Sequence, residues 1–261
     1  MHTRPLLAAL VVVLALAACE RPAAPQGDPE ALALLDRTRI HHGSGQLDRA
    51  EVSFSFRGTP FTVRRDNGAF RYARTLTDSL GRTVEEVVDN DGPHRFVDGA
   101  EVPLDAAEAG RLTTAVNSVV YFALLPAPLT DPAVRARVLT PDRVGGEDYD
   151  RVAVTFAREG GGADFDDEYV YWLRQTDGQI GYYAYTFAVT PGDTARAATG
   201  TRFREPIGES RVGGVLFQDW RNWSADSLGA LSTYGDVFDE RRTFVVSDVV
   251  LDDIRVVPIG R

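Results

Sequence analysis

The sequence contains no lysine, so all 28 of its basic residues are arginines. This absence excludes every site that depends on a lysine amine: the phosphate-binding lysine of P-loop proteins, the lysine of protein kinases, Schiff-base catalysis and a Ser-Lys dyad. Acidic residues outnumber the arginines, which gives a net charge of −10 and a pI of about 4.9. Such a charge argues against a nucleic-acid partner and against charge-driven binding to anionic lipid.

Cysteine is nearly as scarce, because Cys19 is the only one in the chain. No disulfide can form within the chain, and no second thiol is present for catalysis or zinc binding. Residues 6–18 are apolar, too few for a stable membrane span, and end in Leu16-Ala17-Ala18 before Cys19. This arrangement matches the bacterial lipobox, in which the cysteine is lipidated and becomes the mature N-terminus. The alternative is a plain secretory signal with a chance cysteine.

The chain therefore divides into three expected segments. Residues 1–19 are a lipoprotein signal peptide cleaved before Cys19, residues 20–27 are a tether rich in Pro and Ala, and residues 28–261 are a single half-barrel domain. Acylated Cys19 would anchor the protein to a cell-envelope membrane, facing the periplasm, with the outer membrane favoured. No second apolar run is long enough to span a bilayer.

Most of the domain has the two-residue period of β-strands. Apolar residues alternate with polar ones from about residue 50, and residues typical of tight turns separate the runs. Further strands are expected at 60–66, 69–77, 82–88, 94–98, 149–156, 168–174, 179–189, 199–206, 211–223 and 241–257. The pattern predicts an α+β, mainly β fold: one large, curved antiparallel sheet of roughly ten strands that forms an incomplete barrel, plugged by one or two helices.

Three helices interrupt the strand pattern. The first begins at Asp28-Pro29 and ends at Gly43, and a short one is expected at 131–139. The longest follows a capping box of Asp105 and Glu108 and ends before two prolines. Its last two turns, "VVYFALL", are apolar on every side, so this helix end must be buried or must face something apolar.

Residues 158–174, "REGGGADFDDEYVYWLR", hold the densest group of carboxylates. A calcium site at Asp164, Asp166 and Glu168 is a minority interpretation, because neighbouring strand residues point to opposite faces and the helix-loop-helix calcium pattern is incomplete. The negative charge of these carboxylates also argues against a phosphate-binding loop formed by the three glycines. A hairpin connection between the strands at 149–156 and 168–174 is the preferred reading, and no cofactor is expected.

Catalytic motifs are not found. His41, His42 and His94 match no zinc-protease helix, and no Gly-x-Ser-x-Gly elbow is present. His41 and His42 are interpreted as a helix end, where a cationic side chain suits the helix dipole. Carboxylate pairs for glycoside hydrolysis carry little weight, since 38 acidic residues always supply some pair.

The second-half strands are rich in aromatic residues. "YYAYTFAV" places Tyr183, Tyr185, Phe187 and Val189 on one face, and "DEYVYWL" places Tyr169 and Tyr171 on one face with Trp172 on the other. The plain interpretation is an ordinary core. The functional alternative is an apolar cavity lined by aromatic rings with polar tips.

Four stretches together carry a resemblance to a known group: "HHGSGQLDRAEVSFSFRGTPFTV", "AVNSVVYFALLPAPLTDPAV", "VAVTFAREGGGADFDDEYVYWL" and "RFREPIGESRVGGVLFQDW". Over about residues 30–225 the chain resembles an uncharacterised family of bacterial envelope lipoproteins. That family is similar in organisation to the periplasmic lipoprotein-carrier and outer-membrane lipoprotein-receptor fold, in which helices plug an incomplete barrel. The resemblance implies binding of acyl chains or another lipid and supplies no catalytic residue.

The leading functional expectation is a lipid-anchored envelope protein that binds an acyl chain, lipid or other apolar ligand in a half-barrel cavity, in lipid or lipoprotein trafficking. It is not expected to be an enzyme or to bind nucleic acid. The candidate lid and lining residues are Val119, Tyr121, Phe122, Leu125, Trp172, Tyr183 and Tyr185. The alternatives are an anchored protein-interaction scaffold with a filled core and a hydrolase that uses carboxylates or calcium.

Overall fold

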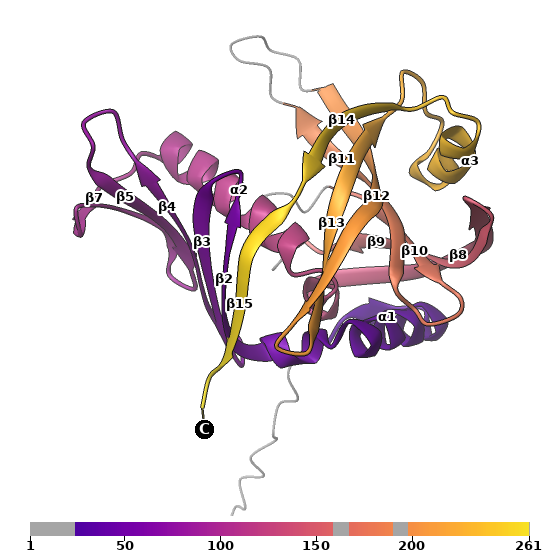
Figure 1. Cartoon of the computed structure of the whole chain (residues 1–261), viewed down its shortest axis with the longest axis horizontal. Helices are drawn as coiled ribbons and strands as arrows, with labels where there is room; N and C mark the ends of the chain where they lie inside the picture. The colour runs from indigo at the N-terminus through magenta and orange to yellow at the C-terminus, as the bar shows by residue number, and fades with distance from the viewer. Residues whose placement is uncertain (1–23, 159–166, 190–197, 261) are drawn as a thin grey trace, which may run out of the picture.

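The computed structural model describes residues 24–158, 167–189 and 198–260, and its fold is mainly β with three α-helices. The strands form two sheets that do not close into a barrel (Figure 1). Sheet A has eight strands in the order β1-β8-β9-β10-β11-β12-β13-β14, and sheet B has seven in the order β15-β2-β3-β4-β5-β6-β7. The predicted mainly β, incomplete barrel is confirmed, but the expected single sheet is wrong.

Sheet B is the predicted meander. Its strands are β2 (Arg49–Phe56), β3 (Thr59–Asp66), β4 (Ala69–Thr77), β5 (Thr83–Asp89), β6 (Gly92–Val97), β7 (Ala100–Val102) and β15 (Leu251–Pro258). Asn67 and Gly68 turn β3 into β4 with φ values of 50° and 99°, a left-handed conformation that asparagine and glycine tolerate best. The four strands predicted between 60 and 98 therefore form as expected, with ends displaced by a residue or two.

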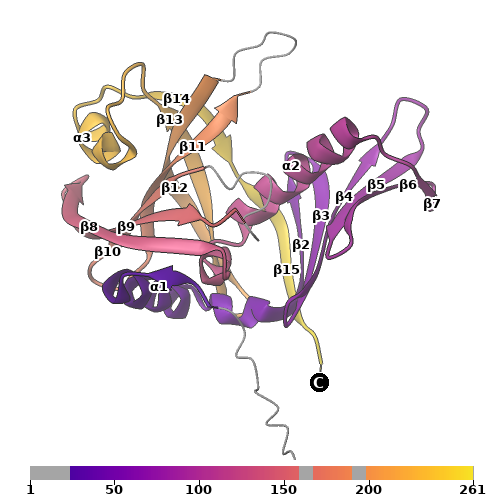
Figure 2. The same cartoon turned by 180° about the vertical axis from the view of Figure 1, so that it is seen from behind.

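Helix α2 (Ala106–Ala123) lies between the two sheets (Figures 1 and 2). Its predicted capping box is present: the Asp105 carboxylate accepts from the backbone N–H of Glu108, and the Glu108 carboxylate accepts from that of Asp105. Leu112, Val116 and Val120 recur at helical spacing and pack on sheet B with Phe54, Phe61 and Val63. Most of α2 therefore belongs to the core of sheet B.

Sheet A comprises β1 (Gln26–Gly27), β8 (Val134–Val144), β9 (Glu147–Phe156), β10 (Tyr169–Arg174), β11 (Ile180–Val189), β12 (Ala198–Val212), β13 (Val215–Ser224) and β14 (Phe244–Val249). Helix α1 (Pro29–His42) packs on its inner face, and α3 (Tyr234–Asp239) packs on its outer face. Short 3-10 turns complete the chain at Ser44–Asp48, Ala127–Thr130 and Leu231–Thr233.

The short helix predicted at 131–139 is wrong, because these residues enter strand β8. Asp131-Pro132 resembles a helix start, but Val134, Ala136 and Val138 lie on the inner face of sheet A and alternate with arginines. Strand β8 pairs with β9 along nearly its whole length. The two-residue period and the partner strand prevail over the local helix signal.

The C-terminal strand predicted at 241–257 forms two strands in different sheets. β14 pairs with β13 of sheet A, and after Val250 the chain continues as β15, which pairs with β2 of sheet B. The bend between β14 and β15 lets the two sheets diverge as the arms of a V, with α2 between them (Figure 1). This divergence is why two sheets form where one was expected.

The N-terminal side of the domain also differs in detail. Gln26 and Gly27, predicted to belong to the tether, pair in parallel with β8 as β1. Asp28 precedes α1 as predicted, but its carboxylate accepts from the backbone N–H of Val138 rather than from the helix. Gly43 ends α1 in the left-handed conformation, as predicted. Among the described residues, no helix combines the length and the apolar character needed to cross a membrane.

Candidate functional site

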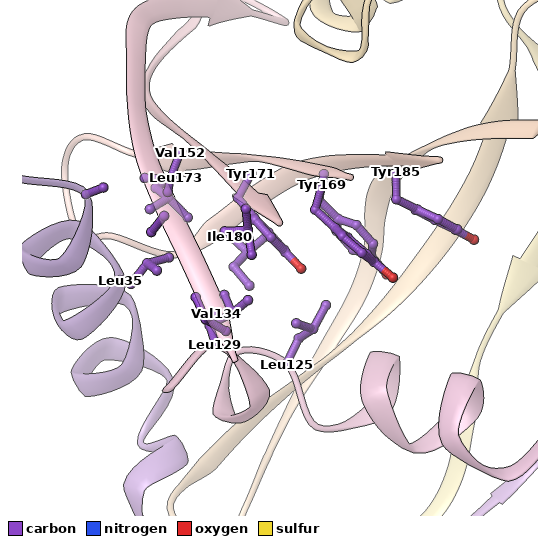
Figure 3. Close-up of a cluster of buried hydrophobic side chains, with 14 of the residues drawn as sticks. Leu35, Leu125, Leu129, Val134, Val152, Tyr169, Tyr171, Leu173, Ile180 and Tyr185 are labelled. Atoms are coloured by element: carbon purple, nitrogen blue, oxygen red, sulfur yellow. The ribbon is translucent and has the colours of Figure 1, made fainter. Parts of the chain in front are cut away.

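Four tyrosines form a continuous cluster on the inner face of sheet A. β10 and β11 pair so that Tyr169 lies opposite Tyr185 and Tyr171 lies opposite Tyr183. The ring centroids of these pairs are 5.6 and 5.7 Å apart, and the rings are stacked. Figure 3 shows the hydroxyl groups of Tyr169, Tyr171 and Tyr185 pointing to the same side. This set of four side chains is called the tyrosine cluster below.

The end of α2 covers the tyrosine cluster. Tyr121 and Phe122 are turned away from sheet B, and the Phe122 ring lies 4.9 Å from that of Tyr185. The hydroxyl oxygens of Tyr121 and Tyr171 are 2.9 Å apart and share a hydrogen bond. Leu125 lies just beyond the C-terminal end of α2 and packs in the same cluster. Tyr121, Phe122 and Leu125 together are called the lid.

Burial keeps the phenols of this region neutral. It raises the pKa of Tyr121, Tyr171 and Tyr183 above the usual value, since a phenolate loses hydration in the interior. A phenol with a raised pKa is a poor general base at neutral pH. The cluster can therefore contribute apolar ring surface and hydrogen-bond donors, but not proton abstraction.

Arg204 on β12 lies beside the cluster and was not identified from the sequence. It pairs across the sheet with Tyr183 and is only 5% exposed. Its Nη1 donates to the Tyr183 hydroxyl at 2.8 Å, and its Nη2 donates to the Tyr185 hydroxyl at 3.1 Å. The Phe122 ring covers the guanidinium with its centroid 4.0 Å away, a cation–π contact.

The guanidinium of Arg204 carries its charge without a carboxylate partner among the described residues. Burial acts to lower the pKa of Arg204, but the two tyrosine oxygens outweigh this effect and the pKa is raised. The Nε of Arg204 is buried and has no hydrogen-bond partner. The same holds for Trp220 Nε1 and Asn222 Oδ1, two residues apart on the adjacent strand β13. Unpaired buried polar atoms are rare enough to mark a site of interest.

Five of the seven predicted lining residues come together here. Tyr121, Phe122, Leu125, Tyr183 and Tyr185 share one cluster. They are packed against one another rather than around an open space, so the lid fills the inner face in this conformation. Two surface clefts lie elsewhere in the described part of the chain. One, of about 350 Å³, has a mostly polar lining formed by His41, Arg174, Asp177, Gln179, Glu209, Ser210, Arg211 and Leu216. The other, of about 500 Å³, lies along α2 and is lined by Ala106, Ala107, Gly110, Arg111, Thr114 and Ala115.

Val119 and Trp172 do not belong to this site, which corrects the prediction. Val119 packs with the core of sheet B, since it lies on the α2 face that carries Val116 and Val120. Trp172 follows the strand alternation to the outer face, where it packs near Phe203 and donates to the Asp142 carboxylate at 2.8 Å. Both residues serve packing in other layers.

The acidic stretch at 158–174 lies only partly within the described residues. Asp164 and Asp166 of the minority calcium prediction, like Cys19, lie outside the described residues. Glu168 is exposed, and its backbone N–H donates to the Thr186 hydroxyl. The strands on either side of the loop, β9 and β10, pair as the predicted hairpin. Within residues 24–158, 167–189 and 198–260, no group of three or more His, Cys, Asp or Glu side chains is placed to hold a metal ion.

The two adjacent histidines end helix α1, as predicted, but the expectation of a cationic side chain there is wrong for His42. His42 is almost fully buried, and its Nε2 accepts from the backbone N–H of Ile180 at 3.2 Å. Burial, assisted by His41, lowers the pKa of His42 to about 4. His42 is therefore neutral at pH 7 and fastens α1 to the start of β11, a structural role.

Comparison with solved structures finds distant likenesses. A Vibrio parahaemolyticus domain described as an outer-membrane lipoprotein-sorting protein is 9% identical, with a TM-score of 0.43 over 87% of this chain and 93% of that one. A DUF1329 family protein from Desulfovibrio piger is 10% identical, with a TM-score of 0.36 over 86% and 92%. Lipoprotein LppX of Mycobacterium tuberculosis is 15% identical, with a TM-score of 0.27 over 61% and 89%. At such low identities and TM-scores, none of these similarities assigns a ligand or an activity to this chain.

Comparison of sequences gives a firmer result. No curated protein matches the sequence. Residues 49–249 match a family of unknown function, and this match extends about 25 residues beyond the C-terminal limit of the resemblance noted from the sequence. The matched range includes the tyrosine cluster, the lid and Arg204. Because the match covers most of the chain, the protein belongs to the family of unknown function DUF6503.

Proposed function

We propose that the protein binds the acyl chain of a lipid, or a similar apolar ligand, on the inner face of sheet A. The observation that carries this proposal is the tyrosine cluster, an apolar ring surface that, among the described residues, is covered by three lid side chains and not by a further strand or a whole helix. Apolar sites with a few polar groups are typical of small-molecule binding. The proposed site lies between the two arms of the V.

The lid side chains can move away from sheet A without disrupting the strand pairing of either sheet. α2 is held to sheet B through its other face, and only its last turn reaches the tyrosine cluster. Burying two aromatic side chains such as Tyr121 and Phe122 is worth about 3–6 kcal/mol. An acyl chain that buries eight methylene groups supplies about 6 kcal/mol, at roughly 0.8 kcal/mol each. A ligand of ordinary acyl length can therefore offset the loss of the lid contacts.

Binding is favoured over catalysis by the chemistry of the site. Burial raises the pKa of the Tyr171 and Tyr183 phenols, and the strong charge beside them is the guanidinium of Arg204, which does not exchange protons near neutral pH. A lipid anchor at Cys19 would place such a protein at a bacterial envelope membrane, the location proposed from the lipobox. Labelling cells with a fatty acid should mark the wild-type protein and leave Cys19→Ser unlabelled.

The proposed function is tested with a neutral ligand. Purified protein is titrated with hexadecan-1-ol and examined by native mass spectrometry, and material purified directly from cells is extracted and analysed for lipid. We expect one chain bound per protein. Phe122→Ala should change the bound fraction by removing a lid ring, whereas Phe244→Ala, on an exposed edge strand, should not. A protein that carries no lipid from cells and does not bind hexadecan-1-ol would refute the proposal.

A protein-interaction scaffold is the second candidate, favoured by one specific observation. β14 is the last strand of sheet A, and Phe244, Val245 and Val246 on it are 48%, 50% and 42% exposed. Exposed apolar edge strands are sites where another chain can add by β-pairing. Cross-linking in the envelope would then trap a protein partner, and Phe122→Ala would lower stability without altering any retained ligand.

A further inference from the structure

Arg204 is a buried cation that has no anionic partner among the residues that the structure describes. The residue is 5% exposed, and its hydrogen-bond acceptors are the phenol oxygens of Tyr183 and Tyr185. Removing an ion from water costs several kcal/mol, which an opposite charge normally offsets. Other arginines of sheet A, such as Arg151 and Arg221, pair with Asp142 and Asp248 respectively. Arg204 therefore departs from the way this protein accommodates its arginines elsewhere.

The surroundings of Arg204 also hold more donors than acceptors. Two of the five guanidinium N–H groups donate to the phenols, and the Nε–H group has no partner. Trp220 Nε1–H, on the adjacent strand, is a second unpaired donor, and its ring lies 4.8 Å from that of Tyr183. Within the described part of the chain, the unpaired buried acceptor near them is the Oδ1 of Asn222, a residue that pairs directly across the sheet with Arg204. A donor-rich, positively charged site is complementary to an anion.

From this imbalance we infer that the ligand of the inner face is an amphiphile with one anionic headgroup, a carboxylate or a phosphate, which Arg204 binds while the chain lies along the tyrosine cluster. This inference rests on the proposed function. A guanidinium edge with a free Nε–H matches the two oxygens of either headgroup. The phenols of Tyr183 and Tyr185 accept from Arg204 with their oxygens, so their hydroxyl hydrogens are available to the same anion.

Lid opening and headgroup binding are linked by Phe122. Its ring covers the guanidinium at 4.0 Å, so a headgroup that approaches Arg204 must displace the ring that also covers Tyr185. The net charge of −10 repels anions from a distance, but salt screens exposed charges beyond about 10 Å at 0.1 M. Recognition therefore depends on the local groups around Arg204.

The test compares ligands that share one chain and differ in headgroup. Hexadecanoate, hexadecyl phosphate and hexadecan-1-ol are each titrated into the purified protein, with dissociation constants taken from tryptophan fluorescence, to which buried Trp220 contributes. We expect at least one of the two anions to bind tenfold or more tightly than the alcohol. The preferred anion identifies the source: hexadecanoate indicates a free fatty acid, and hexadecyl phosphate indicates a phospholipid headgroup.

Variants assign the preference to Arg204. Arg204→Met should weaken binding of the preferred anion at least tenfold and leave the alcohol within twofold. Arg204→Lys keeps the charge but not the planar guanidinium, so its affinity for the preferred anion should lie between those of the wild-type protein and Arg204→Met. This variant replaces Arg204→Met in the test if the methionine variant does not fold. Arg221→Gln, which removes an exposed arginine of the neighbouring strand, is the matched control and should change nothing.

Three results would overturn the inference. Equal affinity of the wild-type protein for anions and alcohol would refute the headgroup while leaving the proposed apolar site intact, and would mean that water alone satisfies Arg204. An anion preference that survives in both Arg204 variants would place the headgroup elsewhere. Failure of all three compounds to bind would refute the proposed function itself.

Discussion

Glu86 in sheet B and Arg204 in sheet A are buried to nearly the same extent, with 4% and 5% exposure, but their surroundings are opposite. Glu86 lies between two arginines: Arg74 on β4 and Arg95 on β6 both donate to its carboxylate. Arg95 also reaches Glu108 on α2. The charge of Glu86 thus joins three strands and a helix, whereas the charge of Arg204 is joined to no opposite charge in residues 24–158, 167–189 and 198–260.

The aromatic residues of the two arms differ in the same way. Sheet B contributes mainly phenylalanines: Phe54 and Phe61 are stacked with centroids 5.3 Å apart, and the one tyrosine of this core, Tyr72 on β4, is only partly buried among the described residues. Sheet A contributes tyrosines, whose hydroxyls require partners when buried. The arm of sheet B is therefore a conventional core that holds α2, and the arm of sheet A carries the polar atoms that a ligand can use.

The largest expected effect is on the core of sheet B. Phe54→Ala should reduce the free energy of unfolding by about 3–5 kcal/mol, because it removes a fully packed ring and leaves a cavity beside Phe61. Urea denaturation measures the loss. Phe244→Ala, at a side chain that is half exposed, is the control and should cost less than about 1 kcal/mol. Similar losses in both variants would mean that sheet B is not the stabilising arm.

A pH-dependent effect of about 3 kcal/mol is expected from His42, on the side of sheet A. Its pKa in the folded protein is about 4 against an ordinary value of 6.5, so the unfolded chain binds the proton more readily. The contribution of His42 is complete above pH 6.5 and is lost progressively as the pH falls toward 4, by about 3 kcal/mol in all.

Comparing the wild-type protein with His42→Gln isolates this effect from the carboxylates that also titrate in acid. Glutamine retains a hydrogen-bond acceptor for the N–H of Ile180 but does not ionise. The stability difference between the two proteins should shrink by about 3 kcal/mol between pH 7 and pH 4. A constant difference across this range would show that His42 is not held neutral by its burial.

The elements of sheet B were predictable because their signals are local. Alternation, turn residues and the capping box of Asp105 and Glu108 are set by neighbours in the sequence, and each appears where expected. The strand at 134–144 was missed because Asp131-Pro132 imitates a helix start, and its alternation only becomes decisive once β9 is its partner.

The candidate site was half predictable for a related reason. Tyr183 and Tyr185 stand out as large aromatic residues, and alternation places them on one face. Arg204 lies in "TRFREP", where alternation separates it from Phe203 but does not tell which of the two faces the interior. That choice depends on the pairing of Tyr183 with Arg204, and strand order is not a property of a local segment. The same ignorance of face led to Trp172, and not Tyr169 and Tyr171, being chosen from its strand as a lining residue.

Neutralising Glu86 should have a smaller effect than opening the core. Glu86→Gln keeps the shape of the side chain but removes the charge that Arg74 and Arg95 share, and hydrogen bonds to charged groups contribute about 1.5–3 kcal/mol. Because both arginines are partly exposed and regain water, we expect a loss of about 1–2 kcal/mol in urea denaturation. No measurable loss would mean that this network does not join α2 to sheet B.

Replacing Arg204 should change the stability of the protein least. Arg204→Met keeps a side chain of similar length beside Phe122 and removes a buried charge for which the described residues supply no counter-ion. Because replacing a buried charge with an apolar side chain is often neutral or stabilising, the unfolding free energy without ligand should change by less than about 1 kcal/mol. The variant is measured beside Glu86→Gln in the same urea titration. A loss of more than about 3 kcal/mol would show that the two tyrosine bonds and the aromatic contact make Arg204 a structural residue, and the contrast between the two arms would then disappear. Near-neutral stability together with lost anion preference would instead mean that the charge is retained for a ligand, since the fold itself does not require it.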